Sequence, residues 1–129
     1  MKIDHVGIAV RSLEAAIKAY EAIGLKVSST DTVANEAVKV AFLPIGDTRL
    51  ELLEPIAPES SIAQSIERRG EGVHHIALRV ENIEESMRLA KEKGLQLVNE
   101  TPRIGAHGRK IAFIHPKSTG GVLLELVQD

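Results

Sequence analysis

The pattern of the stretch Gly70-Glu71-Gly72-Val73-His74-His75-Ile76-Ala77-Leu78-Arg79-Val80 occurs twice in the chain, and the expected fold follows from that recurrence. Two glycines interrupt whatever precedes the stretch, and a strand-like run then opens with two histidines. The other occurrence is Asp4-His5-Val6-Gly7-Ile8-Ala9-Val10, in which His5 stands 70 positions before His75. The recurrence indicates two copies of one module that are used together.

The elements after each of these strands also repeat. Each half continues with a helix that has a polar N-cap and a glycine after its last turn. Three further strands follow, and the last of them carries a glutamate between leucines. In the first half the helix starts at Leu13 after Ser12 and ends at Gly24, and strands are expected over 26–33, 38–43 and 49–53. In the second half a helix is expected over 83–93 after Asn82, with strands over 110–114 and 122–127.

The repeat predicts the fold class. We expect an α+β protein made of two tandem βαβββ modules, which form a curved mixed sheet around a central metal site. Module 1 covers about 1–58 and module 2 about 70–129, with a short linker helix over about 61–69. At 129 residues, one domain is expected.

Composition excludes several classes of function. The net charge is only −2, and no block of five or six like charges occurs, which argues against nucleic acid or a membrane as partner. The chain has no cysteine, so disulfides, thiolate metal sites and a cysteine nucleophile are excluded. The N-terminus shows no signal-peptide pattern and no stretch reaches 18 apolar residues. A cytoplasmic protein is expected.

Four residues with metal-ligating side chains stand in equivalent places of the two halves. They are His5 and His75 on the first strand of each half, and Glu51 and Glu125 on the last. A single strand histidine is more often a hydrogen-bonded or surface residue than a ligand, and a glutamate between leucines often faces water. Two such pairs at equivalent positions favour a metal-binding role over a structural one, because two imidazoles and two carboxylates suit a divalent transition metal. The repeat therefore predicts a metal site that leaves positions open for a substrate.

The sequence resembles the vicinal oxygen chelate superfamily, which includes glyoxalase I, extradiol dioxygenases and bleomycin-resistance proteins, and within it most resembles the methylmalonyl-CoA epimerases. The similarity covers essentially the whole chain. The first-strand histidines and last-strand glutamates are common to several relatives, whereas the loop and C-terminal motifs are more diagnostic of the epimerases. The matching segments are Asp4–Val10, Gly70–Ala77, Ile104-Gly105-Ala106-His107-Gly108 and His115-Pro116-Lys117-Ser118-Thr119-Gly120-Gly121-Val122-Leu123-Leu124-Glu125-Leu126.

The resemblance implies a metal-dependent epimerase that interconverts the epimers of methylmalonyl-CoA through an enolate. Its metal would be held by the residues matching His5, Glu51, His75 and Glu125. Cobalt is the ion expected, with zinc, nickel or manganese as alternatives. The implied partners are an acyl-CoA substrate and a second copy of the chain in a homodimer.

Epimerisation removes a proton on one face of a carbon and returns one on the other, so two acid/base groups are expected. Glu125 is the first choice, because the family gives its counterpart a base role. For the second base, some relatives carry a glutamate on the third strand of the first half, where this sequence aligns Lys39. Lys39, Glu51 or a water remain alternatives, and the symmetry of the repeat favours Glu51.

Substrate contacts are expected from the loops of the second half. His107, in the Gly-Ala-His-Gly loop, is a candidate for the mouth of the site, although an exposed loop histidine is an equally good interpretation. Lys117, together with Arg68 and Arg69, is a candidate for the phosphates of coenzyme A. His74 alternates away from His75, so it is expected to pack or to meet solvent instead of binding metal.

Three other functions use the same fold. A glyoxalase I-like lyase acting on a thiol hemithioacetal is the main alternative, because it uses the same two-histidine, two-glutamate set. A metal-free binding module is disfavoured by the presence of all four ligand types. An extradiol dioxygenase is disfavoured because its iron site uses only three protein ligands.

Overall fold

The computed structural model describes all residues from 1 to 129 and separates them into two compact units. The first unit is residues 5–74, and the second combines residues 1–4 with residues 75–129. This division follows the repeat but differs from the expected modules in two respects. The first four residues belong to the second unit, and the linker helix belongs to the first.

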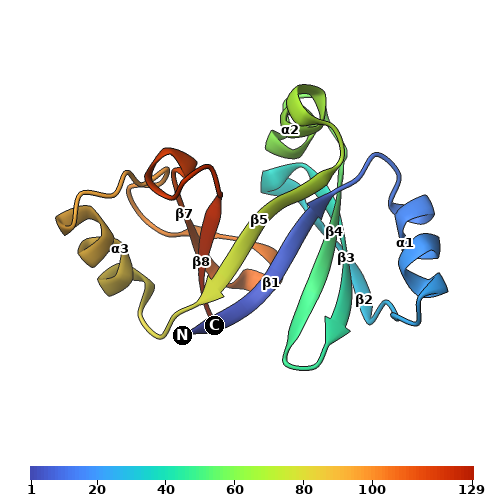
Figure 1. Ribbon diagram of the computed structural model, residues 1–129, viewed down its shortest axis with the longest axis horizontal. Coiled ribbons are helices and arrows are strands. Elements are labelled where there is room, and N and C mark those ends of the chain that lie inside the picture. Colours follow the sequence, from blue (N-terminus) through green and yellow to red (C-terminus); the bar gives the residue numbers. More distant parts are fainter. The chain divides into compact units, whose positions relative to one another are not determined.

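The first unit contains one βαβββ module and the linker helix (Figure 1). Its four strands lie in the order β2-β3-β4-β1, with β1 parallel to β4 and the other pairs antiparallel. The elements are β1 (Lys2–Ala9, of which residues 2–4 belong to the second unit), α1 (Leu13–Ala22), β2 (Ser29–Val33), the 3₁₀ turn η1 (Ala34–Glu36), β3 (Val38–Ile45), β4 (Thr48–Pro55) and α2 (Ser61–Arg69).

The second unit repeats the module with the strand order β5-β8-β7-β6. Strands β5 and β8 are parallel, and β8–β7 and β7–β6 are antiparallel. The elements are β5 (Gly72–Arg79, of which residues 72–74 belong to the first unit), α3 (Ile83–Glu92), β6 (Arg103–Ile104), η2 (Ala106–Gly108), β7 (Lys110–Ile114), η3 (Pro116–Ser118) and β8 (Leu124–Gln128). The expected α+β class and the two βαβββ modules are therefore confirmed.

Each module packs its long helix against one face of its own strands. In the first unit, residues of α1 pack on a core cluster formed by Val10, Ala41, Leu43 and Leu52. In the second, α3 buries Ile83 and Met87 in a cluster with residues of β7 and β8. Because side chains alternate along a strand, the other face of each module is left to a different set of residues.

The helix starts confirm the capping residues read from the sequence. The Ser12 hydroxyl accepts a hydrogen bond from the Ala15 amide, and the Asn82 side chain accepts one from the Glu85 amide. Gly24 has a φ of 101°, a backbone conformation that glycine adopts without strain after the last helical turn.

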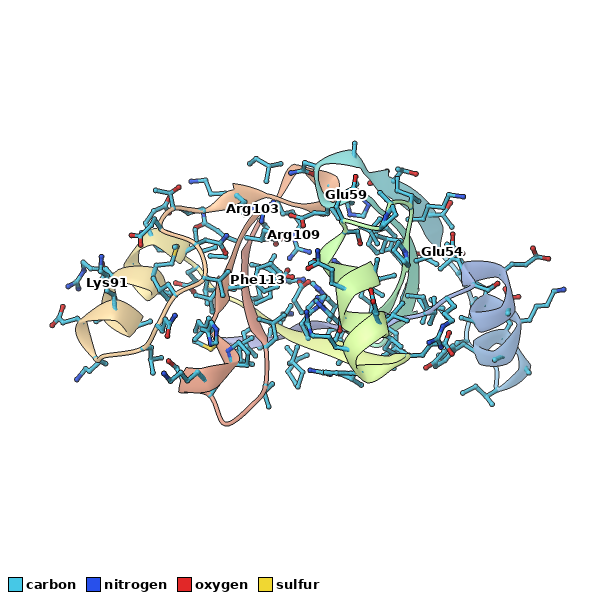
Figure 2. All side chains as sticks on the ribbon, turned by 90° about the horizontal axis from the view of Figure 1, so that it is seen from above. Glu54, Glu59, Lys91, Arg103, Arg109 and Phe113 are labelled. Carbon is cyan, nitrogen blue, oxygen red and sulfur yellow. The ribbon has the colours of Figure 1, made fainter.

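A second cap, which the sequence did not predict, also repeats between the modules. The Leu13 amide donates to Oε1 of Glu54 at 2.8 Å, and Figure 2 shows Glu54 beside α1. The Ile83 amide donates to Oε1 of Gln128 at 2.7 Å. Each helix is thereby tied at its first residue to the last strand of its own module.

Two strand boundaries differ from the sequence expectation. β2 begins at Ser29 instead of residue 26, because Leu25 and Val27 pack against the core cluster under α1. β8 begins at Leu124 instead of residue 122, because Gly120 and Gly121 adopt positive φ values and the Gly121 amide bonds to the Pro116 carbonyl. None of the three α-helices is long and apolar enough to span a lipid bilayer.

Candidate functional site

The first unit brings His5 and Glu51 together on the face opposite α1. Strands β1 and β4 are parallel, with Gly7 opposite Glu51, so His5 lies on the same face two residues earlier. Nδ1 of His5 is 3.2 Å from Oε2 of Glu51. Both residues are buried, at 3% and 5% exposure. Gly7 has no side chain, so this position of β1 places no side chain between the His5 imidazole and the Glu51 carboxylate.

Arg49 also contacts Glu51 in this unit. It lies two residues before Glu51 on β4, and its Nε donates to Oε2 of the carboxylate at 2.9 Å. Its guanidinium carbon is 5.4 Å from the centre of the Phe42 ring, a distance at which a cation is attracted to an aromatic face. The sequence analysis did not single out Arg49, although its i−2 spacing from Glu51 was a signal that it shares the same strand face.

The second unit repeats the histidine–glutamate pair in equivalent register. Ala77 lies opposite Glu125 between β5 and β8, as Gly7 lies opposite Glu51. Nε2 of His75 is 3.3 Å from Oε1 of Glu125, and both residues are buried. The His75 ring meets Phe113 edge-on at 5.9 Å, and Phe113 is itself opposite Glu125 on β7. Phe113 is labelled in Figure 2.

The donors of each pair fit a divalent transition metal. A neutral imidazole nitrogen and a carboxylate oxygen are ligands of zinc, cobalt, nickel and manganese in proteins. Burying a carboxylate is costly unless a cation or hydrogen-bond donors compensate it. One pair supplies only two protein ligands, fewer than the three or four that such ions take from a catalytic site. Each unit therefore carries two of the four residues that the sequence predicts as metal ligands.

Asp4 forms a buried ion cluster that the sequence did not reveal. It is fully buried, and its Oδ1 accepts hydrogen bonds from Nε and Nη2 of Arg79 at 3.0 and 2.8 Å. Arg109 adds bonds of 2.6 Å to Oδ1 and 3.0 Å to Oδ2. These contacts fix residues 1–4 to the second unit, directly before His5. No local pattern pairs residues 75 and 105 positions apart, which is why sequence reading missed them.

Lys39 lies on the other face of its strand from the His5–Glu51 pair. β3 and β4 are antiparallel, with Phe42 opposite Glu51 and Lys39 opposite Glu54. Because alternate residues point to opposite faces, Lys39 is on the side that carries α1. Its counterpart in the repeat, Lys110, pairs with Glu84 at the start of α3 at 3.0 Å. The register therefore does not support Lys39 as an acid/base residue beside Glu51.

On the sheet face that carries Glu51, the neighbouring strand β3 has no titratable side chain. Val38, Val40 and Phe42 alternate along it, and all three are buried. The first unit thus offers Glu51 and His5, but no further carboxylate from this strand, for proton transfer on that face.

The two predicted substrate residues lie in short exposed turns of the second unit. His107 is in η2 with a φ of 60°, an uncommon conformation for a residue other than glycine. The Lys117 amide in η3 donates to Nδ1 of His115, so His115 caps this turn. Both side chains are exposed. Their roles in substrate binding stay predictions.

His74 differs from its neighbour in electrostatic environment. Burial, followed by the positive charges of Arg69 and Arg68, lowers the pKa of His74 to about 4. It is therefore neutral at physiological pH. Arg69 in turn donates to the Val73 carbonyl at 3.1 Å, which holds it at the end of α2.

Comparison with known protein families identifies the superfamily to which this repeated fold belongs. Residues 4–113 match the model of the glyoxalase/bleomycin resistance protein/dioxygenase superfamily. The chain belongs to this superfamily. The match includes His5 and His75, the first-strand histidines of the repeat.

Close relatives cover nearly the whole chain. Human mitochondrial methylmalonyl-CoA epimerase is 40% identical over 98% of this chain and 73% of its own length. Among solved structures, a hypothetical protein from Bacillus halodurans has a TM-score of 0.97 at 45% identity and covers 99% of this chain and 94% of that one. A variant of Streptomyces coelicolor methylmalonyl-CoA epimerase in complex with 2-nitronate-propionyl-CoA has a TM-score of 0.96 at 36% identity, covering 100% and 94%.

Proposed function

We propose that this protein is a methylmalonyl-CoA epimerase, which interconverts the two epimers by proton abstraction at C2. The observation that carries the proposal is the pair of histidine–glutamate contacts in equivalent register, within a chain that resembles named epimerases over nearly its full length. The C2 hydrogen of this substrate is acidic because it lies between a thioester carbonyl and a carboxylate. Its removal gives an enolate whose charge the protein must stabilise.

His5, Glu51, His75 and Glu125 would together hold one divalent metal ion, each unit supplying two of the four ligands. The ion would supply Lewis-acid stabilisation of the substrate's oxygens and of the charge that develops on them. The aromatic and aliphatic residues around each pair, such as Phe42 and Phe113, would exclude water and strengthen this stabilisation.

Glu125 and Glu51 are the proposed acid/base groups. Glu125 is the first choice from the resemblance, and Glu51 is its counterpart in the repeat. Two bases that belong to different modules suit a reaction in which the proton leaves one face and returns to the other. Lys39 is left out of this scheme, because the register of β3 and β4 sets it on the opposite face from Glu51.

The coenzyme A portion is proposed to contact His107 and Lys117, with Arg68 and Arg69 as further partners for its phosphates. Cobalt as the ion, a homodimeric assembly and a cytoplasmic location are further parts of the proposal. The cobalt ion and the dimer come from the resemblance of the sequence, and they need separate measurements of metal content and molar mass.

The test is exchange of the C2 hydrogen of methylmalonyl-CoA with deuterium from solvent, followed by mass spectrometry. Protein supplied with cobalt should catalyse exchange, and protein freed of metal with a chelator should not. The hemithioacetal of methylglyoxal and glutathione, assayed in parallel, separates the main alternative. Turnover of that adduct without exchange on methylmalonyl-CoA would overturn the proposal and favour a glyoxalase I-like lyase.

A further inference from the structure

Arg49 is a charged residue in contact with Glu51 that the proposed mechanism leaves unassigned. It shares the strand face of Glu51, and its side chain is 20% exposed, whereas that of Glu51 is 6% exposed. The contact with Oε2 of Glu51 and the approach to the Phe42 ring hold the guanidinium at the edge of the buried pair. An arginine in this position brings a permanent positive charge, because its side chain stays protonated in proteins.

The second unit has no charge at the equivalent position. Glu125 corresponds to Glu51, so the residue that corresponds to Arg49 is Leu123. The other members of the pair are matched, with histidine against histidine and phenylalanine against phenylalanine. If a neighbouring arginine were needed to orient the glutamate, the second unit would need one as well. Glu125 nevertheless lies 3.3 Å from His75 without an arginine at that position.

The charge itself is therefore the feature to explain. Two glutamates would balance the charge of a divalent ion, and the two histidines would serve as neutral ligands. Arg49 adds one positive charge beside this balanced set. A substrate with a carboxylate next to its thioester brings one negative charge, and proton abstraction creates another on the enolate. A guanidinium suits both, because it binds carboxylates with paired, charge-assisted hydrogen bonds.

We propose that Arg49 is a specificity-determining residue that selects acyl-CoA substrates carrying a free carboxylate next to the thioester, the malonyl-type thioesters. This inference rests on the proposed function and deepens it. A simple acyl-CoA such as propionyl-CoA has no free carboxylate for this charge to bind.

The experiment compares two ligands that differ in the carboxylate and share coenzyme A. Binding of methylmalonyl-CoA and of propionyl-CoA to the cobalt-loaded protein is measured by calorimetry, and bound metal is measured separately. Arg49→Met keeps the length of the side chain and removes its charge. This variant should raise the Kd for methylmalonyl-CoA by about 10- to 100-fold and keep the Kd for propionyl-CoA within about twofold of wild type. Arg49→Lys, which restores the charge without the planar fork, should recover part of the loss.

Arg88→Met is the matched control, since Arg88 lies on the exposed surface of α3 and pairs with Glu85 and Glu92. This control variant should leave the affinity for both ligands unchanged. The proposal is overturned if Arg49→Met weakens both ligands equally, weakens neither, or loses the metal, because the last result would make Arg49 a positioning residue for Glu51. A different result would show that the proposed function is wrong: wild-type protein would bind methylmalonyl-CoA but would not exchange its C2 hydrogen.

Discussion

At the residue scale, the two glutamates are equivalent in register but differ in their surroundings. Glu51 accepts from Arg49 and lies beside His5, whereas Glu125 lies beside His75 next to the Phe113 ring. Substituting either by glutamine keeps its size and removes its charge. Such variants can therefore show whether both carboxylates move protons.

We expect Glu125→Gln and Glu51→Gln each to abolish interconversion of the epimers, with losses of about 10²- to 10⁴-fold, since that is the usual contribution of a general base. Each variant should still exchange the C2 hydrogen of one epimer, and the surviving epimer should differ between the two. Deuterium incorporation into each pure epimer measures this. If both variants fail with the same epimer, the two-base assignment is wrong.

The buried charge of Asp4 makes a separate prediction about stability. Asp4→Ala leaves Arg79 and Arg109 without the carboxylate that both contact, and we expect unfolding to become easier by about 3 kcal/mol. Chemical denaturation measures the change.

Asp129→Ala is the comparison, because Asp129 contacts the same Arg109 from an exposed position and should cost no more than about 1 kcal/mol. Equal losses for the two variants would show that burial of Asp4 does not decide the energy of the cluster.

At the scale of elements, the repeat extends to how each helix is attached. Glu54 and Gln128 come from the last strand of their own modules, and each accepts a hydrogen bond from the first residue of the helix. Without these bonds an amide of the first turn loses its partner. The same role is filled by a charged side chain in one unit and by a neutral one in the other.

We therefore expect Glu54→Ala and Gln128→Ala to destabilise the protein by similar amounts, about 1 kcal/mol each, with Glu54→Ala the larger because a carboxylate also favours the helix N-terminus. Thermal unfolding followed by circular dichroism gives the two values. Glu59→Ala, at an exposed residue before α2, is the control and should stay within about 0.5 kcal/mol of wild type. A loss confined to one module would contradict the equivalence of the two caps.

At the scale of the whole molecule, the proposed metal site needs both units, because each supplies two ligands. Metal that binds only the folded protein should raise its stability, by about 2.7 kcal/mol when the ion is present at 100 times its Kd. We expect one ion per chain, and we expect His5→Ala and His75→Ala each to remove most of that stabilisation. Melting curves with and without cobalt, together with metal analysis, test this.

A different result would contradict a single metal site. Two ions per chain, or an undiminished rise in melting temperature in one of the histidine variants, would show that each histidine–glutamate pair binds metal on its own. The Arg88→Met variant again provides a fold-neutral comparison.

Much of this arrangement was predictable from the sequence because it is periodic and local. The 70-residue repeat, the caps Ser12 and Asn82, and the strand patterns predicted two βαβββ modules, and the structure confirms them. The repeat predicted that two histidines and two glutamates act together, and the structure shows one histidine–glutamate contact within each unit.

Other features depend on which residues distant in sequence become neighbours, and a one-dimensional pattern does not contain that information. Strand register placed Lys39 on the α1 side of its sheet, away from Glu51, because one residue along a strand reverses the face. Folding also joined Asp4 to Arg79 and Arg109, and attached α1 and α3 to Glu54 and Gln128. Periodicity thus indicates elements and faces, whereas partners across the chain are chosen by packing and by the pairing of buried charges.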